Sequence, residues 1–373
     1  MKPLKLALIR QRYTPFVGAE RFVSRAMDAL QAQGASITLV TREWEGGDDA
    51  LTCDPFYLGS LWRDWGFARC VCRTLAQHNF DLVQSHERIA CCDIYRAGDG
   101  VHREWLAQRS RVLGPWKRIG LRFNPYHRYT LAAERRLFAS PQLKAIICNS
   151  RMVKAEIMRH FGVAEDKLHV IYSGVDLEAF HPRLKERHRL PVRAQLGIPE
   201  HATIFLFVGS GFERKGLAAA LRALPPDAYL AVIGHDKRAG RYQALANQLG
   251  IADRVHFLGP QQDVKPYYGA ADVLVLPTLY DPFPNVALEA LACGLPVVTS
   301  TKCGAAELLA QTGLVVDALD TAALGAAMTT LLDKNHRATL GEQARRLASE
   351  FGMQAMTDNL LRLYGELMPR AGV

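Results

Sequence analysis

Short apolar runs rich in β-branched residues alternate with helical patterns along nearly the whole chain, and this alternation constrains the fold more than any other feature. The runs are KLALIR, SITLVT, FDLVQS, AIICNS and LHVIY in the first half, and TIFLFVG, AYLAVIG, RVHFLG, DVLVLP, PVVTS and GLVV in the second. Strands that are apolar along their whole length are typical of parallel sheets covered by helices on both faces. The pattern therefore predicts a doubly wound α/β fold.

The pattern occurs twice, which predicts two Rossmann-like domains facing each other across a cleft. The length of 373 residues also exceeds that of one typical domain. A segment rich in charge and proline, YSGVDLEAFHPRLKERHRLPVRAQLGIPEHA, separates the two halves. We expect an N-terminal domain over 1–175, a C-terminal domain over 176–352 and a C-terminal helix over 353–373. The sequence does not decide what this helix packs against, and a return to the N-terminal domain is one option.

The chain shows no targeting or membrane-spanning pattern. The short run LALI is followed by Arg10 and Arg12, unlike a signal peptide, and no window approaches 18 consecutive apolar residues. We therefore expect a cytoplasmic protein. The eight cysteines include no C-x-x-C pair and no histidine spacing suited to zinc, which favours reduced structural thiols.

A net charge of +9 favours an anionic partner, and the excess is concentrated in 102–138. This segment contains nine basic and two acidic residues, a net charge of +7. Aromatic residues are interleaved with the bases, namely Trp105, Trp116, Phe123, Tyr126 and Tyr129. Bases and aromatic rings together are typical of contact with an anionic membrane surface. We expect peripheral contact with the cytoplasmic face of the inner membrane; the alternative is a solvated helical face with core aromatics.

In the second half, the strand TIFLFVG runs into a glycine loop and then into FERKG, where a helix begins. This order places Arg214, Lys215 and free backbone amides at the carboxyl edge of a sheet. Open α/β sheets bind phosphate-bearing ligands at that edge. The pair therefore predicts a phosphate site.

The stretch DPFPNVALEALACG has the same order of strand, loop and helix, and it contains two carboxylates. Pro284 suits the first turn of the helix, so the amides of Asn285 and Val286 are expected to point out of the helix end. These amides and Asp281 offer donors and acceptors to the hydroxyls of a sugar. Glu289, about one turn deeper, suits the vicinal hydroxyls of a ribose; the alternative is a buried glutamate paired with an arginine.

The first strand leads into YTPFVGAERF, where Gly18 allows close approach of the backbone to an anion. This is one glycine of a G-x-G-x-x-G pattern, so a nicotinamide cofactor is disfavoured. His86 and His102 follow strands of the first half and are weaker candidates for contact with a substrate.

Taken together, YTPFVGAERF, DIYRAGD, VGSGFERKG and LEALACGLPV resemble the retaining glycosyltransferases of family four, which have the GT-B fold. The segment ICNSRMVKAEIMRHFGVAEDKLHVIYSGVDLEAFHP looks like the family's approach to the second domain, so the resemblance covers nearly the whole chain. Within the family, the chain is most similar to the WaaG-like glucosyltransferases of the lipopolysaccharide core.

The resemblance implies roles for individual positions. The E-x7-E motif corresponds to Asp281 and Glu289, with Glu289 on the nucleotide ribose and Asp281 on the donor sugar. Arg214 and Lys215 correspond to the pair that grips the diphosphate, and Gly18 to the second glycine of the family's G-G loop. Substrate contacts are expected from Gly18, Asp99, Arg214, Lys215, Asp281, Phe283, Pro284, Asn285, Val286 and Glu289. Catalytic roles are expected for Asp99, Arg214 and Lys215.

Asp99 of YRAGDG corresponds to a position that is histidine in many members of the family. It can hold a hydroxyl of the transferred sugar or act as a general base, and the resemblance favours the first role. Two positions depart from the family: Val17 replaces the first glycine of the loop, and Asp281 replaces a glutamate. The shorter side chain of Asp281 leaves the identity of the donor sugar open.

These features predict transfer of a hexosyl unit from a nucleotide diphosphate sugar, of the UDP-glucose or UDP-N-acetylhexosamine type, to a glycan of the lipopolysaccharide core. The resemblance implies front-face substitution, in which a phosphate oxygen of the donor accepts the proton of the acceptor. Because the sequence contains no carboxylate cluster suited to Mg²⁺, we expect neither a metal nor another cofactor.

Two alternatives remain open at this point. A nucleotide-sugar epimerase has a related fold, but it requires acid and base groups on both sides of the sugar, and Asp99 is the single candidate here. A non-catalytic binder of nucleic acid or of a membrane surface would use the basic segment. Because no nucleic-acid-binding motif is present, we expect no nucleic-acid partner.

Overall fold

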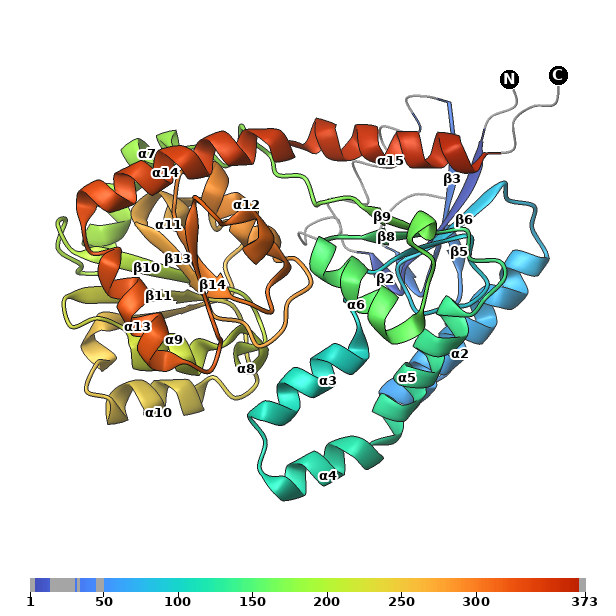
Figure 1. The fold of residues 1–373 in the computed structure, drawn as a ribbon, viewed down its shortest axis with the longest axis horizontal. Helices are drawn as coiled ribbons and strands as arrows, with labels where there is room; N and C mark the ends of the chain where they lie inside the picture. Colours follow the sequence, from blue (N-terminus) through green and yellow to red (C-terminus); the bar gives the residue numbers. More distant parts are fainter. Residues whose placement is uncertain (1–3, 14–30, 32–33, 45–49, 369–373) are drawn as a thin grey trace. The chain divides into compact units, whose positions relative to one another are not determined.

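The computed structural model describes residues 4–13, 31, 34–44 and 50–368. The chain forms two compact units: unit 1 comprises Met1–Ser173 and Gln354–Val373, and unit 2 comprises Gly174–Met353. Each unit contains a parallel sheet with helices on its faces, which confirms the predicted two-domain α/β class (Figure 1). The sequence predicted the two domain boundaries after residues 175 and 352.

Among its described residues, unit 1 contains a seven-stranded parallel sheet in the order β5-β3-β1-β6-β7-β8-β9. The strands of this sheet are β1 (Lys5–Ile9), β3 (Ser36–Thr41), β5 (Ala50–Thr52), β6 (Leu82–Ser85), β7 (Ile94–Arg96), β8 (Ala145–Cys148) and β9 (Leu168–Val170). Beside it, β2 (Arg12–Tyr13) pairs in parallel with β4 (Glu43–Trp44). The central strands are buried along most of their length, as their continuous apolar runs require.

The helices of unit 1 include the whole basic segment as three consecutive helices. The helical elements for which the structure gives bounds are α2 (Gly59–Ala76), α3 (His102–Arg111), α4 (Pro115–Phe123), α5 (Pro125–Phe138), α6 (Arg151–Phe161), η1 (Glu165–Lys167) and α15 (Met353–Leu367). The last helix belongs to unit 1 almost entirely, and there the hydroxyl of Tyr364 donates a hydrogen bond of 2.6 Å to Oε1 of Gln84. In the part of the chain that the structure describes, no helix is long and apolar enough to span a bilayer.

Unit 2 contains a six-stranded parallel sheet in the order β12-β11-β10-β13-β14-β15. Its strands are β10 (Thr203–Val208), β11 (Ala228–Ile233), β12 (Val255–Gly259), β13 (Val273–Leu276), β14 (Val297–Ser300) and β15 (Gly313–Val316). The chain winds outward from β10 in one direction and then, from β13, in the other. This is the strand order of the doubly wound nucleotide-binding fold, and its switch point lies between β10 and β13.

Helices cover both faces of this second sheet, with α7, α11, α12 and α14 on one side and α9, α10 and α13 on the other (Figure 1). The α-helices of unit 2 are α7 (Arg183–Gln195), α8 (Phe212–Lys215), α9 (Leu217–Ala223), α10 (Gly240–Gln248), α11 (Lys265–Ala270), α12 (Asn285–Ala292), α13 (Thr321–Thr330) and α14 (Lys334–Ala348). Short 3-10 turns are η2 (Ala252–Arg254), η3 (Gly304–Leu308) and η4 (Ser349–Phe351). Buried Phe205, Leu230 and Val275 of three strands contribute to a shared apolar core with α9 and α13.

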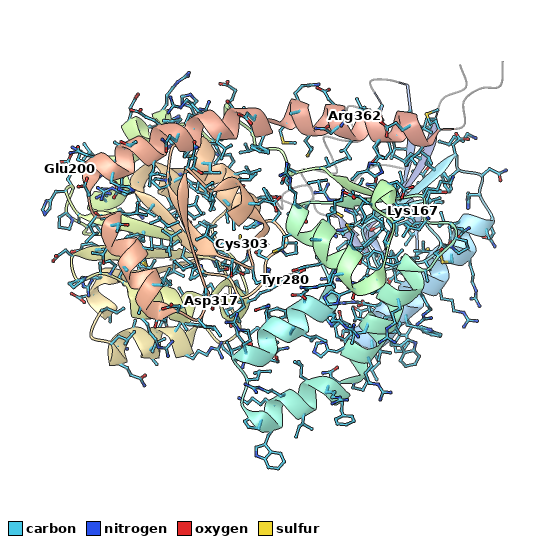
Figure 2. All side chains as sticks on the ribbon, viewed as in Figure 1. Lys167, Glu200, Tyr280, Cys303, Asp317 and Arg362 are labelled. Carbon is cyan, nitrogen blue, oxygen red and sulfur yellow. A yellow bond between two sulfur atoms is a disulfide. The ribbon has the colours of Figure 1, made fainter. Side chains whose placement is uncertain are left out.

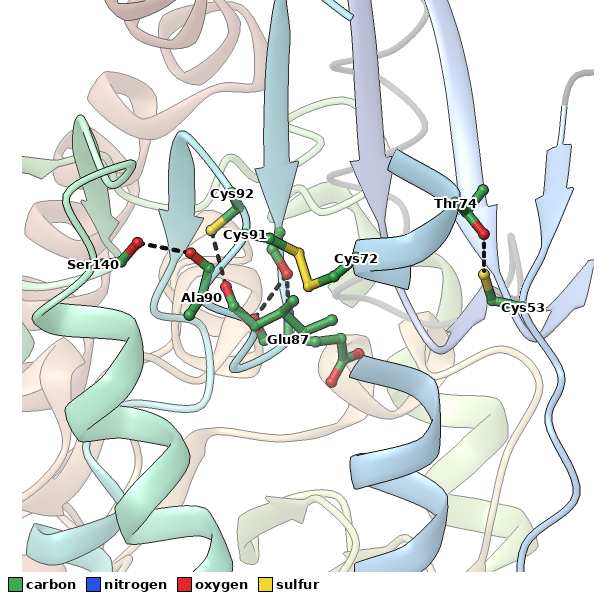
Figure 3. The surroundings of a disulfide bond; sticks show 10 residues. Cys53, Cys72, Thr74, Glu87, Ala90, Cys91, Cys92 and Ser140 are labelled. Carbon is green, nitrogen blue, oxygen red and sulfur yellow. Dashed lines mark hydrogen bonds between the residues drawn. A yellow bond between two sulfur atoms is a disulfide. The ribbon is translucent and has the colours of Figure 1, made fainter. Parts of the chain in front are cut away.

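The cysteines depart from the prediction at one pair. Cys72 of α2 and Cys91, in the loop between β6 and β7, form a disulfide with a Cα–Cα distance of 5.9 Å (Figure 3). The prediction of eight reduced thiols is therefore wrong for these two. The partners are 19 residues apart, so no short motif marks them; packing of the helix against the loop brings them together. The other six are free thiols, and burial raises the pKa of Cys92 and Cys148 to about 12.

Candidate functional site

The loops that follow β10 and β13 meet at the carboxyl edge of the sheet in unit 2. The two strands are parallel neighbours, so both loops leave the sheet at the same edge. The first loop leads into α8, which carries Arg214 and Lys215. The second carries Asp281 and leads into α12, which carries Glu289. Four of the residues that the sequence singled out thus follow the two strands at the topological switch point.

The two loops are joined through their backbones. The carbonyl of Arg214 accepts hydrogen bonds of 2.8 Å from the amide of Leu279 and of 2.8 Å from the hydroxyl of Thr278. Gly216, two positions after Arg214, has a φ of +80°, and a Cβ on it would lie 1.9 Å from the carbonyl oxygen of Pro277. Only glycine permits both this backbone conformation and this approach. A side chain at Gly216 would separate the loops and with them the charged groups that they carry.

The carboxylate of Asp281 lies between two cations. Its Oδ2 accepts hydrogen bonds of 2.5 Å from Nζ of Lys215 and of 3.2 Å from Nη1 of Arg214. Asp281 is 4% exposed and Lys215 is 8% exposed. Burial alone would raise the pKa of the Asp281 carboxyl, but the charges of Lys215 and Arg214 outweigh it and hold the pKa below its usual value. The three side chains form a net positive cluster at neutral pH, in which Asp281 and Lys215 are buried and Arg214 is partly exposed.

The backbone of Asp281 is held by a third loop. Its amide donates a hydrogen bond of 2.9 Å to the carbonyl of Lys302, and its carbonyl accepts a hydrogen bond of 2.8 Å from the amide of Gly304. These contacts connect Asp281 to the end of β14, and Tyr280 and Cys303 lie close to this edge of unit 2 in Figure 2. Three adjacent strand ends therefore determine where the carboxylate lies.

The helix α12 begins one residue later than predicted. Pro284 lies at the N-cap, with φ −75° and ψ 121°, rather than in the first turn, and its carbonyl accepts 3.0 Å from the amide of Ala287. The extended conformation of Pro284 explains the shift, because a residue outside the helical region cannot belong to the first turn. The amides of Asn285 and Val286 still have no acceptor within the helix. Binding of a ligand by these two amides stays a prediction.

Glu289 is hydrogen-bonded to a tyrosine that the sequence did not single out. The hydroxyl of Tyr268, a residue of α11 that is 1% exposed, donates 2.8 Å to Oε2 of Glu289. Burial and the nearby Glu289 charge raise the pKa of Tyr268 well above its usual value, so the hydroxyl remains a donor. No sequence pattern marks a tyrosine 21 positions before its partner, and only the packing of α11 shows the contact.

Two predicted site residues, Asp99 and Gly18, belong to unit 1. Asp99 follows β7, its side chain is 64% exposed, and its Oδ2 lies 3.6 Å from Nη1 of Arg88. Arg88 in turn donates 3.0 Å to Oε1 of Glu134, which also accepts 2.8 Å from the amide of His102. Asp99 is thus the accessible end of a buried charged network. Gly18 lies outside the described residues.

The two histidines of the first half are buried rather than presented to a ligand. Burial lowers the pKa of His86 well below its usual value and lowers that of His102 to about 3, with nearby Arg96 and Arg88 adding to the respective shifts. Both are therefore neutral at pH 7. Next to His86, burial raises the pKa of Glu87, whose Oε1 accepts 3.1 Å from the amide of Gln11. The sequence did not single out Glu87, because an isolated glutamate after a strand has no distinguishing pattern.

The described residues contain no group of three or more His, Cys, Asp or Glu side chains arranged to hold a metal ion. The charge available at the strand ends of unit 2 instead comes from Arg214 and Lys215. In chemical terms, this arrangement offers cations, free helix amides and a tyrosine-bound carboxylate along one sheet edge. Such a set suits a ligand with phosphate groups and hydroxyl groups.

Comparison with known proteins covers both halves of the chain. Residues 16–179 match the family described as Glycosyltransferase Family 4, and residues 189–347 match Glycosyl transferases group 1. The lipopolysaccharide glucosyltransferase WaaG of Escherichia coli (strain K12) is 27% identical over 322 residues, covering 82% of this chain and 83% of that protein. The D-inositol 3-phosphate glycosyltransferase 2 of Catenulispora acidiphila is 31% identical over 317 residues, covering 78% and 72%. The crystal structure of WaaG matches with a TM-score of 0.82 and 25% identity, covering 96% and 99%.

Proposed function

The chain belongs to the glycosyltransferases of group 1 and family 4, and on that premise we propose that it transfers a hexosyl unit from a UDP-sugar to a glycan of the lipopolysaccharide core. The observation that carries the proposal is the cluster of Arg214, Lys215 and Asp281 at the switch point of unit 2. A ligand diphosphate placed there would face two cations held in position before it arrives. The name of the 27% identical relative supports the choice of acceptor.

Departure of the nucleotide diphosphate is the step that this cluster assists. Negative charge grows on the diphosphate as the glycosidic bond breaks, and preorganised cations in a water-poor site stabilise it. A charge-assisted hydrogen bond contributes about 1.5 to 3 kcal/mol. Lys215 is the main contributor because it is the more buried of the two cations, while the half-exposed Arg214 adds charge at the rim. We propose that this charge is sufficient without a metal ion.

The other two parts of the donor are assigned to α12 and to the turn before it. Glu289, oriented by the Tyr268 hydroxyl, accepts hydrogen bonds from the ribose. The free amides of Asn285 and Val286 donate to the hydroxyls of the sugar, and Phe283 lies in the turn that leads to them. Asp281 completes this side of the site, where its contact with Lys215 links the recognition of sugar and phosphate.

Retention of configuration does not require a protein nucleophile in this proposal. A phosphate oxygen of the donor accepts the proton of the acceptor hydroxyl on the same face of the sugar, as the family resemblance implies. Asp99 then holds a hydroxyl of the transferred sugar rather than serving as the base. Its exposed carboxylate and its anchor on Arg88 suit an acceptor of hydrogen bonds.

A panel of nucleotides and sugars tests the proposal. Thermal unfolding with UDP, ADP and GDP should show stabilisation by UDP, since a ligand that binds the native state stabilises it according to its affinity. Release of UDP from UDP-glucose and UDP-N-acetylglucosamine, with and without a lipopolysaccharide core acceptor, then identifies the donor. Stabilisation by none of the three nucleotides, with no acceptor-dependent release, would contradict the proposal.

We also propose that α4 attaches the enzyme to the anionic cytoplasmic face of the inner membrane. No residue of this helix is buried, and the three large apolar side chains Trp116, Ile119 and Phe123 are 86%, 51% and 66% exposed. Lys117, Arg118 and Arg122 accompany them on the same short helix. Such a helix lies in the plane of a membrane interface, with its apolar face among the acyl chains and its bases near the headgroups.

A further inference from the structure

Unit 2 contains a cavity of about 1010 Å³ on the edge of the sheet opposite to the phosphate cluster. Its lining includes Asp272 and Pro296, which directly precede β13 and β14, so it lies at the amino ends of the strands. The helices α7 and α14 supply about half of its lining residues. Figure 2 places Glu200, which also lines the cavity, far across unit 2 from Tyr280. Most of the cavity therefore lies away from the candidate donor site.

The lining of the cavity is strongly basic. Its cationic residues are Lys185, Arg189, Lys334, Arg337, Arg345 and Arg346. Its acidic residues are Glu200, Asp272 and Glu342. Three of the cations are arginines with planar guanidinium groups on α14, a geometry that matches phosphate oxygens.

Of these acids only Asp272 is buried, and it is already paired with arginines of unit 2. The carboxylate of Asp272 accepts 2.9 Å from Nη1 of Arg189 and 2.6 Å from Nη2 of the buried Arg193. Arg337 and Arg345 are anchored by neutral acceptors: Arg337 donates to the Thr203 hydroxyl and to two carbonyls, and Arg345 donates to three carbonyls. Their positive charges are therefore held in place without a carboxylate to balance them.

The side chains of three further cations that line the cavity, namely Lys185, Lys334 and Arg346, form no hydrogen bond or ion pair with any described residue. Burial and the neighbouring positive charges of Arg189, Arg337 and Lys334 lower the pKa of Lys185, although Asp272 acts in the opposite direction. Cations that repel one another in this way are stabilised by an anion placed between them. No carboxylate of unit 2 forms an ion pair with these three side chains.

We propose that this cavity binds a small molecule carrying two or more phosphate groups. The cations come from two helices and line a cavity of about 1010 Å³, so a single phosphate ion would contact only some of them. Tyr268 also lines the cavity, and its hydroxyl is the donor to Glu289. A ligand in the cavity would thus lie next to Tyr268, which orients Glu289, the proposed hydrogen-bond acceptor for the ribose. The inference depends on unit 2 alone and does not require the proposed transferase mechanism.

Isothermal titration with inorganic tripolyphosphate tests the site. We expect the double variant Lys185→Gln, Lys334→Gln to bind the probe at least about tenfold more weakly than the unmodified protein, since charge-assisted hydrogen bonds are lost. The matched control is Arg183→Gln, Arg187→Gln, which removes the same charge from exposed positions of α7 that do not line the cavity. The control should bind within twofold of the unmodified protein. If both double variants bind tripolyphosphate equally weakly, the loss of affinity is due to the net charge of the protein alone, and the proposal is wrong.

A second comparison separates the cavity from the donor site. UDP affinity should be unchanged in the Lys185→Gln, Lys334→Gln variant and should fall in Arg214→Gln. Tripolyphosphate affinity should fall in the Lys185→Gln, Lys334→Gln variant and should be unchanged in Arg214→Gln. If the probe does not bind, or if its affinity responds only to Arg214→Gln, the cavity site is wrong. If UDP fails to bind while tripolyphosphate depends on Lys185 and Lys334, the cavity site stands and the donor proposal fails.

Discussion

The Nζ atom of Lys215 lies 2.5 Å from Oδ2 of Asp281, although the two residues are 66 positions apart in the sequence. The contact connects the loop after β10 with the loop after β13, which are the two sides of the switch point. The cation assigned to the diphosphate is thus held by an internal carboxylate. Donor phosphates would share this cation with Asp281, which keeps Lys215 in place before and after binding.

Replacing Asp281 by asparagine should destabilise the protein by about 3 kcal/mol, because removal of one partner leaves the buried Lys215 charge without its carboxylate. Urea unfolding measures the change. Asp227→Asn provides the matched control, since Asp227 is exposed in the same unit and should change stability by less than about 0.5 kcal/mol. Equal stability of the two variants would show that the Lys215–Asp281 pair does not hold the loops together.

Replacing Tyr268 by phenylalanine should raise the KM for the donor about tenfold and leave kcat nearly unchanged, because the variant loses only the hydroxyl that orients Glu289. Tyr267→Phe removes the same atom from the neighbouring residue and should have no effect. Steady-state kinetics with varied donor measures both constants. A fall in kcat at constant KM would assign Tyr268 a role in the chemical step instead.

Replacing Trp116 and Phe123 together by alanine should reduce flotation with anionic vesicles by more than tenfold. Each exposed ring contributes about 1.5 to 3 kcal/mol to membrane binding when it is buried among the lipids, and the variant loses both contributions. The unfolding free energy should not change, because neither side chain is buried. Leu190→Ala, Leu249→Ala alters exposed apolar residues of unit 2 and should float normally. Equal binding of the unmodified protein to neutral vesicles would contradict the electrostatic part of the account.

Stability should fall as the pH drops from about 6.5 to 5. The native pKa of His102 is about 3 and that of His86 is also far below 6.5, so the unfolded state binds protons in this range and the native state does not. Each such histidine costs about 2 kcal/mol at pH 5 relative to pH 7. Urea unfolding at both pH values measures the loss, and His102→Gln should remove about half of it. If His102→Gln loses as much stability between pH 7 and pH 5 as the unmodified protein, His102 is not the cause of the pH dependence.

The class of the fold and the core of the site follow from local sequence. Continuous apolar strands predict the parallel sheets, and the strand–loop–helix order predicts Arg214, Lys215, Asp281 and Glu289 near one sheet edge. The family matches over both halves set aside the epimerase and non-catalytic alternatives. These features are readable because short segments encode them.

The remaining features depend on tertiary packing. The disulfide of Cys72 and Cys91, the hydrogen bond from Tyr268 to Glu289 and the ion pair of Lys215 with Asp281 each join segments that lie 19 or more positions apart. No periodicity encodes such pairs. The capping position of Pro284 was missed for a different reason, since a proline suits both the cap and the first turn and its backbone dihedral angles decide between them.

The most direct test of the account is donor turnover by Lys215→Ala compared with Arg222→Ala, in which an exposed cation of α9 in the same unit is removed. The loss of one preorganised donor to a developing anion costs about 10²- to 10³-fold in kcat. We expect Lys215→Ala to lose that much UDP-sugar turnover while Arg222→Ala retains the unmodified rate. Unchanged turnover by a folded Lys215→Ala protein would contradict the assignment of the cluster as the phosphate grip.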